Sequence, residues 1–375
     1  MSMLSRAQIL QEFSQRFRSL AAKDNSGFWQ EFEDLDNVGK QIPARVGNLE
    51  ANRDKNRYHQ IVPYDHCRVR LSLQNSQPHS DYINASYVPG GCTQRDFICT
   101  QGPLRSTMSD FWRMIWEQKV RIIVMVTALK HEGMVLCDEY WPQERGTVLH
   151  GIVQVTTLFR EQGPDYLITT IHLRQRDCFE ERTVTHYYYS VWPDMGVPKE
   201  LSSLCALTEH VRQHLDTLPL LGPTVVHCSA GVGRTGTFVT LLWLMQLCMR
   251  GVMPDVRAAV EDLRRRRVMM VQNLKQYILI YQCLMQWLGG GDLVHPLSSA
   301  QSPAYPPHLY KGHLQHYHSS KKSSRGNRSR KSREHQEQHT PQAAQTQART
   351  QSSLKQLLNP GNLLRRLLPP SKHKT

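Results

Sequence analysis

The sequence predicts a mixed α/β (α+β) fold, with a highly twisted central sheet flanked by helices and a long polar tail. Short β-rich segments alternate with one helix in the first half of the chain, and helical patterns dominate 201–287. Large apolar residues then become scarce beyond position 288. Hydrophobic residues make up 39% of the chain, which excludes a wholly disordered protein.

The predicted elements follow in chain order. Apolar residues at three- and four-residue spacing within 6–36 predict two N-terminal helical segments, and 39–54 is loop-like. β-branched and aromatic clusters predict strands at 82–83, 97–99, 122–126, 153–159, 166–173, 183–190 and 224–227. The periodicity of the remaining segments predicts helices at 107–119, 201–216, 235–250, 255–266 and 273–287.

Charge divides the chain into two parts. Of its 46 basic and 32 acidic residues, fourteen and three respectively lie in 289–375, so the tail carries most of the net charge of +14. That segment is rich in Ser, Gln and His and too poor in apolar residues to form a core. We therefore expect a folded domain over 1–288 and a disordered basic tail over 289–375.

The cysteines and apolar runs bear on compartment. All nine cysteines lie between Cys67 and Cys283, and none forms a C-x-x-C pair or a zinc-site pattern. The N-terminus lacks the apolar core of a signal peptide, and the longest nearly uncharged apolar run, 235–249, is too short to cross a bilayer. These features predict a soluble, cytoplasmic chain with free thiols and no metal site.

The most specific signal is the segment HCSAGVGRTG (227–236), between a predicted strand and a predicted helix. Backbone N–H groups of such a loop, together with the helix dipole, form a cradle for an anion. A cysteine at its mouth, Cys228, is expected to have a lowered pKa, and Arg234 can return a planar fork of donors to the same anion. Alternatively, Cys228 is one more buried structural cysteine, which a C-x₅-R spacing alone would favour.

The segment HCSAGVGRTGTF resembles the signature of classical protein tyrosine phosphatases. In order along the chain, 55–71 resembles the phosphotyrosine-recognition loop of that family, 190–198 its mobile acid loop and 271–277 its glutamine loop. Its framework segments have counterparts in DYINASYVPG, TQGPL, DFWRMIWE and YWPQ. With GFWQEFEDLDNVG at 27–39, the domain most resembles cytoplasmic domains of receptor-type members with fibronectin type III ectodomains.

The resemblance implies a phosphatase-type fold and assigns the catalytic residues. Cys228 would be the nucleophile that forms a cysteinyl-phosphate, and Asp194 the general acid and then base. Arg234 would bind the phosphate and Thr235 would ease departure of the thiolate. The tuning of the thiolate would fall to His227. Hydrolytic water would be positioned by Gln272 with help from Gln276.

The resemblance likewise implies the substrate contacts. Tyr58 would stack on the substrate phenol, making the pocket too deep for phosphoserine to reach the nucleophile. Gln60 would face the substrate backbone. The phosphate cradle would be formed by the backbone amides of Ser229, Ala230, Gly231, Val232, Gly233 and Arg234. No cofactor is expected, so chelators should have no effect.

Three departures from the family pattern bear on activity. Gln60 replaces a usual Asp or Asn. His131 occupies the place of a usual glutamate that braces the arginine, and Leu136 that of a usual lysine near the acid loop; Glu132 would brace the arginine only after a one-residue shift. The stretch 273–275 replaces usually acidic residues. The departures leave open a catalytically weak or inactive phosphotyrosine-binding module, and Asp194 argues against a phosphoinositide phosphatase.

The tail offers two further patterns. Residues 321–333 hold seven positive charges and could attract an acidic membrane surface or a nuclear import receptor; the alternative is a solvated disordered segment. No sequence-specific nucleic acid is expected. Leucines within 354–368, interrupted by Pro360, could form two short amphipathic turns or no fixed structure. The implied partners of the domain are phosphotyrosine-containing proteins, and a receptor parent or a nuclear location stays open.

Overall fold

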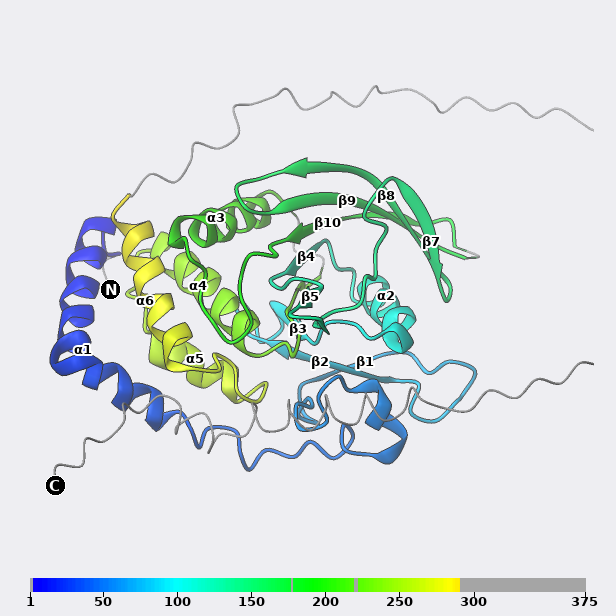
Figure 1. The fold of residues 1–375 in the computed structure, drawn as a ribbon, viewed down its shortest axis with the longest axis horizontal. Coiled ribbons are helices and arrows are strands. Elements are labelled where there is room, and N and C mark those ends of the chain that lie inside the picture. Colours follow the sequence, from blue (N-terminus) through cyan, green and yellow to red (C-terminus); the bar gives the residue numbers. More distant parts are fainter. Residues whose placement is uncertain (1–2, 177, 219–221, 291–375) are drawn as a thin grey trace, which may run out of the picture. The chain divides into compact units, whose positions relative to one another are not determined.

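The computed structural model describes residues 3–176, 178–218 and 222–290. They form a nine-stranded mixed sheet with helices on both faces (Figure 1), which confirms the fold class predicted from the sequence. The basic run 321–333 and the leucines of 354–368 lie outside the described residues.

The sheet has the strand order β1-β2-β3-β11-β4-β10-β9-β8-β7. Its four middle strands, β3, β11, β4 and β10, are parallel, and antiparallel strands extend both ends. The strands are β1 Arg68–Arg70, β2 Tyr82–Val88, β3 Phe97–Thr100, β4 Ile122–Met125, β7 Gly146–His150, β8 Val153–Gln162, β9 Leu167–Gln175, β10 Glu181–Tyr188 and β11 Thr224–His227. A separate hairpin joins β5 Lys130–His131 to β6 Met134–Val135.

The helices divide between the two faces of the sheet. The helix α2 (Met108–Glu117) packs near β7 and β8, while the remaining helices gather on the other side, as Figure 1 shows. These are α1 Arg6–Asp34, α3 Leu201–Thr217, α4 Gly233–Met249, α5 Val256–Arg264 and α6 Leu274–Leu288. Two short 3₁₀ helices span Glu50–Lys55 and Arg105–Thr107.

The apolar run 235–249 forms most of α4, which is buried on nearly all sides. The helix contacts α3, α5 and α6 as well as β11, and these contacts on several sides explain why it has no polar face. Among the residues that the structure describes, no helix is both long enough and apolar enough to cross a membrane.

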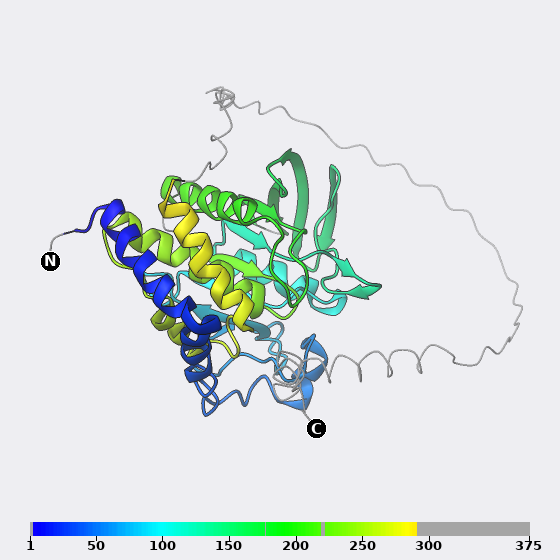
Figure 2. The ribbon, with the colours of Figure 1, turned by 60° about the vertical axis from the view of Figure 1, so that its left-hand side comes forward.

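The N-terminal helix α1 is broken where the sequence predicts a boundary between two segments. Lys23, Asp24 and Asn25 have positive φ values, so the chain turns there before continuing through Phe28. Ser5 and Gln8 form a capping box at its start. The helix lies against α6, on the outside of the helical layer (Figure 2).

Two edge strands escape sequence prediction. β1 has only three residues, and β7 is almost entirely exposed, with neither a long run nor a clear alternation of apolar residues. Both are defined by pairing with a neighbour: β1 with β2, and β7 with β8. Their existence therefore depends on tertiary contacts.

Candidate active site

The central strand β11 delivers the small-residue loop to the carboxyl end of the parallel strands. β11 ends at His227, Cys228 follows directly, and α4 begins at Gly233. No side chain caps this helix at Val232, so its first N–H groups remain available to a ligand. The strand–loop–helix arrangement predicted from the sequence is confirmed.

Gly231 fixes the shape of this loop. Its φ is +72°, and an added Cβ would lie 2.1 Å from the Thr100 carbonyl oxygen at the end of β3. The N–H of Gly102 donates to the Ser229 carbonyl oxygen at 2.9 Å. The neighbouring strand therefore presses the loop into one conformation, and only glycine fits at position 231.

Beneath the loop lies Arg267, a buried arginine that the sequence analysis did not single out. Its Nε donates to the Gly231 carbonyl oxygen at 2.8 Å, and its Nη2 to that of Ala230 at 3.0 Å. The same Nη2 also lies 2.8 Å from Asn84 Oδ1, which ties the loop to β2. With its carbonyls held from below, the loop can direct its N–H groups into the cradle. The residue belongs to a run of four arginines, so nothing in the local pattern distinguishes it from its neighbours.

The Cys228 thiol is buried, with 3% of the residue exposed. Burial alone would raise its pKa, but Arg234, the hydroxyl and backbone N–H of Thr235 and the backbone N–H of Gly231 outweigh burial and lower it. Cys99 and Cys137, which lack such a donor set, have pKa values raised by burial. Cys228 thus differs from ordinary buried cysteines in favouring the thiolate.

Arg234 joins the loop to the segment that contains Asp194. Its Nη2 lies 2.8 Å from Asp194 Oδ1, and its Nη1 donates to the Trp192 carbonyl oxygen at 3.1 Å. The side chain of Arg234 is 3% exposed and that of Asp194 28% exposed. The carboxylate and the guanidinium form a direct ion pair at the cradle.

The segment around Asp194 is held by two further contacts. The Trp192 indole is buried, and its Nε1 donates to the Gly196 carbonyl oxygen at 3.0 Å, which closes the turn. Asn273 Nδ2 donates to the Met195 carbonyl oxygen at 3.2 Å. Asn273, one of the departures from the family pattern, therefore ties the segment around Asp194 to the start of α6.

Tyr58 lies at the same loop. Its hydroxyl and the Ser229 Oγ are 2.8 Å apart, and burial raises the pKa of the phenol. The structure thus brings the predicted substrate-binding tyrosine to the cradle. Gln60 is exposed two residues further along.

The two glutamines gather at the first turn of α4. The Oε1 atoms of Gln272 and Gln276 are the nearest neighbours of Gly233, 2.9 and 3.0 Å from the position of an added Cβ. The Gln272 backbone N–H donates to Gln276 Oε1 at 3.0 Å, while the buried Gln272 Nε2 has no hydrogen-bond partner in the described chain. Gln272 therefore retains a free amide group beside the cradle.

His227 belongs to a buried chain of polar side chains that ends at His186. The Tyr140 hydroxyl lies 2.7 Å from Nε2 of both histidines. Burial lowers the pKa of His227 to about 4 and that of His186 as well, so both are neutral near pH 7. His227 Nδ1 donates to the Cys228 carbonyl oxygen at 3.1 Å, so its Nε2 accepts from Tyr140, which in turn accepts from His186.

The β5–β6 hairpin shows what the departures at 131–136 do. Leu136 is buried, with 2% exposed, whereas the Glu132 side chain is 81% exposed at the turn. Among the described residues, the ion-pair contact that Glu132 makes is with the His131 ring nitrogen Nε2, at 3.9 Å. Within the described chain, none of the three forms a hydrogen bond or an ion pair with Arg234. The carboxylate partner of Arg234 is Asp194.

The base of this hairpin is fixed by Arg57, another residue that sequence reasoning missed. Its Nη2 lies 2.9 Å from Asp138 Oδ2 and 2.8 Å from the Pro103 carbonyl oxygen. Its Nε donates to the Gly102 carbonyl oxygen at 3.0 Å. The residue next to Tyr58 thereby joins the recognition segment to the hairpin.

Comparison with known proteins agrees with this geometry. The family model described as protein-tyrosine phosphatase matches residues 52–286, well over half of the chain. The chain belongs to this family. The matched region contains every predicted catalytic and substrate-binding residue of this phosphatase-family domain.

Several receptor-type members of the family are similar to it. The receptor-type tyrosine-protein phosphatase V of Rattus norvegicus is 41% identical over 294 residues, covering 78% of this chain and 17% of that protein. The receptor-type phosphatase H of Homo sapiens is 38% identical over 295 residues, covering 78% and 26%. The receptor-type phosphatase F of Danio rerio is 41% identical over 275 residues, covering 73% and 14%. The chain thus spans about a quarter or less of the length of these relatives.

Proposed function

We propose that the domain hydrolyses phosphotyrosine in proteins through a cysteinyl-phosphate intermediate. The observation that carries the proposal is the lowered pKa of Cys228 within a cradle that also holds Arg234 and Asp194. A nucleophile, a phosphate-binding cation and a proton donor thereby meet at one loop.

In the first step, the Cys228 thiolate attacks phosphorus while the bond from phosphorus to the tyrosine oxygen breaks. The N–H groups of 229–234 and the Arg234 fork bind the equatorial oxygens, where negative charge is held in the transition state. Asp194 leaves Arg234 when phosphate arrives, takes up a proton from solvent water and delivers that proton to the departing phenolate oxygen.

In the second step, water attacks the phosphorus of the cysteinyl-phosphate and the Cys228 thiolate departs. Asp194 accepts the proton of that water, and the free amide group of Gln272 orients it. The Thr235 hydroxyl, a buried group with no oxygen or nitrogen partner in the described chain, stabilises the returning thiolate.

Substrate choice is assigned to Tyr58. With its hydroxyl held against Ser229, its ring would stack on the substrate phenol, and a pocket of that depth would select phosphotyrosine over the shorter phosphoserine. Phosphotyrosine-containing proteins are the partners that this geometry implies, in the cytoplasm, where thiols stay reduced. The membrane and import-receptor interactions of 321–333 remain proposals of the sequence alone.

A second candidate function is phosphotyrosine binding without turnover. The observation in its favour is the Arg234–Asp194 ion pair, because it engages the proposed phosphate-binding cation and the proposed proton donor with each other. A phosphoinositide substrate fits less well, since the predicted acid, Asp194, is present at the site.

The deciding experiment is hydrolysis of a phosphotyrosine peptide by the full chain, compared with Cys228→Ser and Asp194→Ala. We expect turnover by the wild type, none by Cys228→Ser, and slow turnover with retained binding by Asp194→Ala. Vanadate should compete with the substrate, and chelators should change nothing. If the wild type binds the peptide but hydrolyses it no faster than Cys228→Ser does, then the domain is a phosphotyrosine-binding module and not an enzyme.

A further inference from the structure

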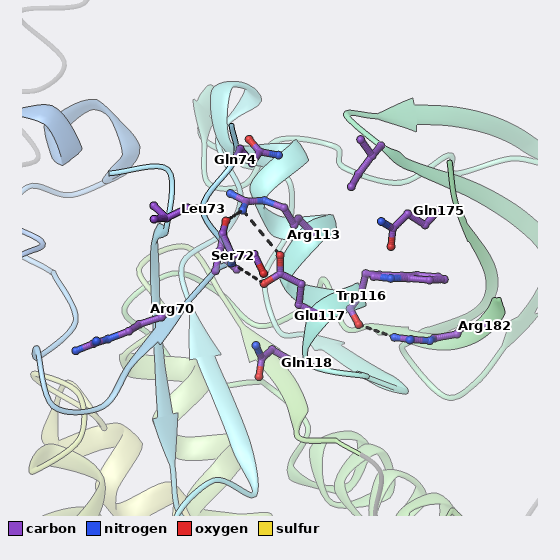
Figure 3. Close-up of a pocket in the computed structure, with 12 residues that line it drawn as sticks. Arg70, Ser72, Leu73, Gln74, Arg113, Trp116, Glu117, Gln118, Gln175 and Arg182 are labelled. Carbon is purple, nitrogen blue, oxygen red and sulfur yellow. Dashed lines mark hydrogen bonds and ion pairs between the residues drawn. The ribbon is translucent and has the colours of Figure 1, made fainter. Parts of the chain in front are cut away.

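Two cavities away from the catalytic loop are lined by arginines, and they differ in whether those arginines are free to bind a ligand. The larger, of about 770 Å³, lies between β1, α2 and β10 (Figure 3). The smaller, of about 570 Å³, lies beside β1 and the segment after α5. Arg70 lines both.

Two of the three arginines that line the larger cavity, Arg113 and Arg182, are already engaged by other groups of the chain. Arg113 donates to the carbonyl oxygens of Ser72 and Ser80 and pairs with Asp110 at 2.9 Å. Arg182 lies flat over the Trp116 ring, with its Cζ 4.1 Å from the ring centroid, and Figure 3 shows it turned to the Trp116 carbonyl oxygen. This cavity therefore has few donors left for a ligand.

The smaller cavity is different. Its lining residues are Asp65, His66, Cys67, Arg68, Arg70, Tyr87, Gln94, Arg95 and Arg266. In the described part of the chain, Arg70, Arg95 and Arg266 form no ion pair with a carboxylate. The one acidic lining residue, Asp65, accepts the backbone N–H groups of Arg45 and Val46 at 2.9 and 3.0 Å. We name these nine residues the arginine pocket.

A buried donor in the arginine pocket is also unpartnered. The Arg68 side chain is 6% exposed, and its Nη2 pairs with Asp81 at 2.5 Å, but its Nε has no hydrogen-bond partner among the described residues. Buried polar groups are usually satisfied, so the Arg68 guanidinium lines the pocket with one of its donors unpaired. Burial and the positive charge of Arg266 lower the pKa of His66, which agrees with a positive potential in the pocket.

The remaining cations are held in place by neighbours. Arg95 lies over the Tyr87 ring, with its Cζ 4.8 Å from the ring centroid. Arg266 donates to Gln94 Oε1 at 2.5 Å, and its carbonyl oxygen accepts from Cys67 Sγ at 2.8 Å. Guanidinium groups that are already oriented lose less entropy when they bind, and their fork suits the oxygens of a phosphate.

We propose that the arginine pocket is a second, non-catalytic phosphate-binding site that takes a phosphorylated segment of a protein. A phosphate monoester supplies the charge and the several acceptor oxygens that Arg68, Arg95 and Arg266 require. The pocket is concave, and its lining has no exposed aliphatic side chain to enter a bilayer, which favours a peptide over a membrane. The proposal does not require catalysis, and it uses the proposed function only in choosing a phosphoprotein as the ligand.

The test is fluorescence anisotropy with a labelled phosphoserine peptide and the full chain carrying Cys228→Ser. We expect binding that weakens roughly tenfold or more when Arg95→Ala and Arg266→Ala are combined, because both forks are lost. Arg145→Ala, which removes an exposed arginine outside the pocket, is the control and should change little. The paired Arg95→Lys and Arg266→Lys variant keeps the charge but loses the forks, and should bind clearly less well than the parent.

Several outcomes overturn the proposal. The first is that the paired alanine variant binds the phosphopeptide as tightly as the Arg145→Ala control. The second is that the paired lysine variant keeps the full affinity of the parent. The third is that the parent binds the unphosphorylated peptide as tightly as the phosphopeptide. If the protein binds vesicles of phosphatidylcholine and phosphatidylserine but not the phosphopeptide, then the ligand of the arginine pocket is a membrane surface and not a phosphorylated protein segment. Hydrolysis of a singly phosphorylated tyrosine peptide by the pocket variants, with Cys228 intact, reports separately on the proposed function.

Discussion

Replacement of Asp194 by asparagine should separate phosphate binding from catalysis. In the structure, the Asp194 carboxylate occupies one arm of the Arg234 fork at 2.8 Å. A phosphate that enters the cradle must displace this carboxylate before it gains both arms. Asp194→Asn removes the charge but keeps the size of the side chain and an oxygen acceptor, so the loop should remain folded.

The gain in affinity follows from the geometry of the pair. A hydrogen bond to a charged group contributes about 1.5–3 kcal/mol. Because the Asp194 side chain is 28% exposed, solvent screening reduces this value, and we take about 1–2 kcal/mol. Orthophosphate or vanadate should therefore bind roughly 5- to 30-fold more tightly to Asp194→Asn. Loss of the general acid should at the same time slow hydrolysis by roughly 10²- to 10⁴-fold.

The assay is titration of the protein with orthophosphate by calorimetry, alongside phosphotyrosine-peptide hydrolysis. Glu132→Gln is the matched control: its side chain is 81% exposed, and its only ion-pair contact among the described residues is with the His131 ring, at 3.9 Å. It should leave phosphate affinity unchanged. If Asp194→Asn and the wild type bind phosphate equally well, then the Asp194 carboxylate does not compete with phosphate for Arg234. If Glu132→Gln binds phosphate more tightly than the wild type, then Glu132 in the hairpin, rather than Asp194, is the carboxylate that acts on Arg234.

Three further predictions follow from the same loop. Because the pKa of Cys228 is lowered, its alkylation by iodoacetamide should continue at pH values below the ordinary thiol range and stop only below the lowered pKa. A midpoint of the alkylation rate against pH at or above that of free cysteine would contradict this. Gly231→Ala should lower the free energy of unfolding in urea by about 2–4 kcal/mol, more than the control Gly133→Ala, whose added Cβ meets no atom within 4 Å. Equal losses for the two variants would show that the close approach of Thr100 does not constrain position 231. Arg267→Met should cost about 3 kcal/mol and weaken phosphate binding, and unchanged binding would show that the loop holds its shape without it.

Much of the fold was readable from the sequence because local patterns and tertiary structure agree. The parallel strands are short apolar runs bounded by polar residues, and α4 is an apolar run too short for a membrane. The break in α1 was likewise indicated by the gap between its two apolar groups. The edge strands β1 and β7 were missed, since pairing with a neighbour, rather than local propensity, defines them.

For the site, the motif 227–236 predicts the chemistry, because it places a thiol, a glycine-rich loop and an arginine at fixed spacing between a strand and a helix. The sequence alone also showed that Asp194, Tyr58 and Gln272 belong to segments of one family pattern. Their convergence on the loop was an expectation, and the contacts with Ser229, Arg234 and Gly233 now describe it.

Only the tertiary structure decided which groups complete the site. Arg267 supports the loop, Tyr140 and His186 extend its hydrogen bonds, and Asp194 rather than a hairpin glutamate pairs with Arg234. These partners lie far apart in the chain, and their residue types, taken locally, fit a solvated surface or a plain core equally well. Burial gives them their roles, because an arginine or histidine removed from water must find a partner, and the fold determines which partner is within reach.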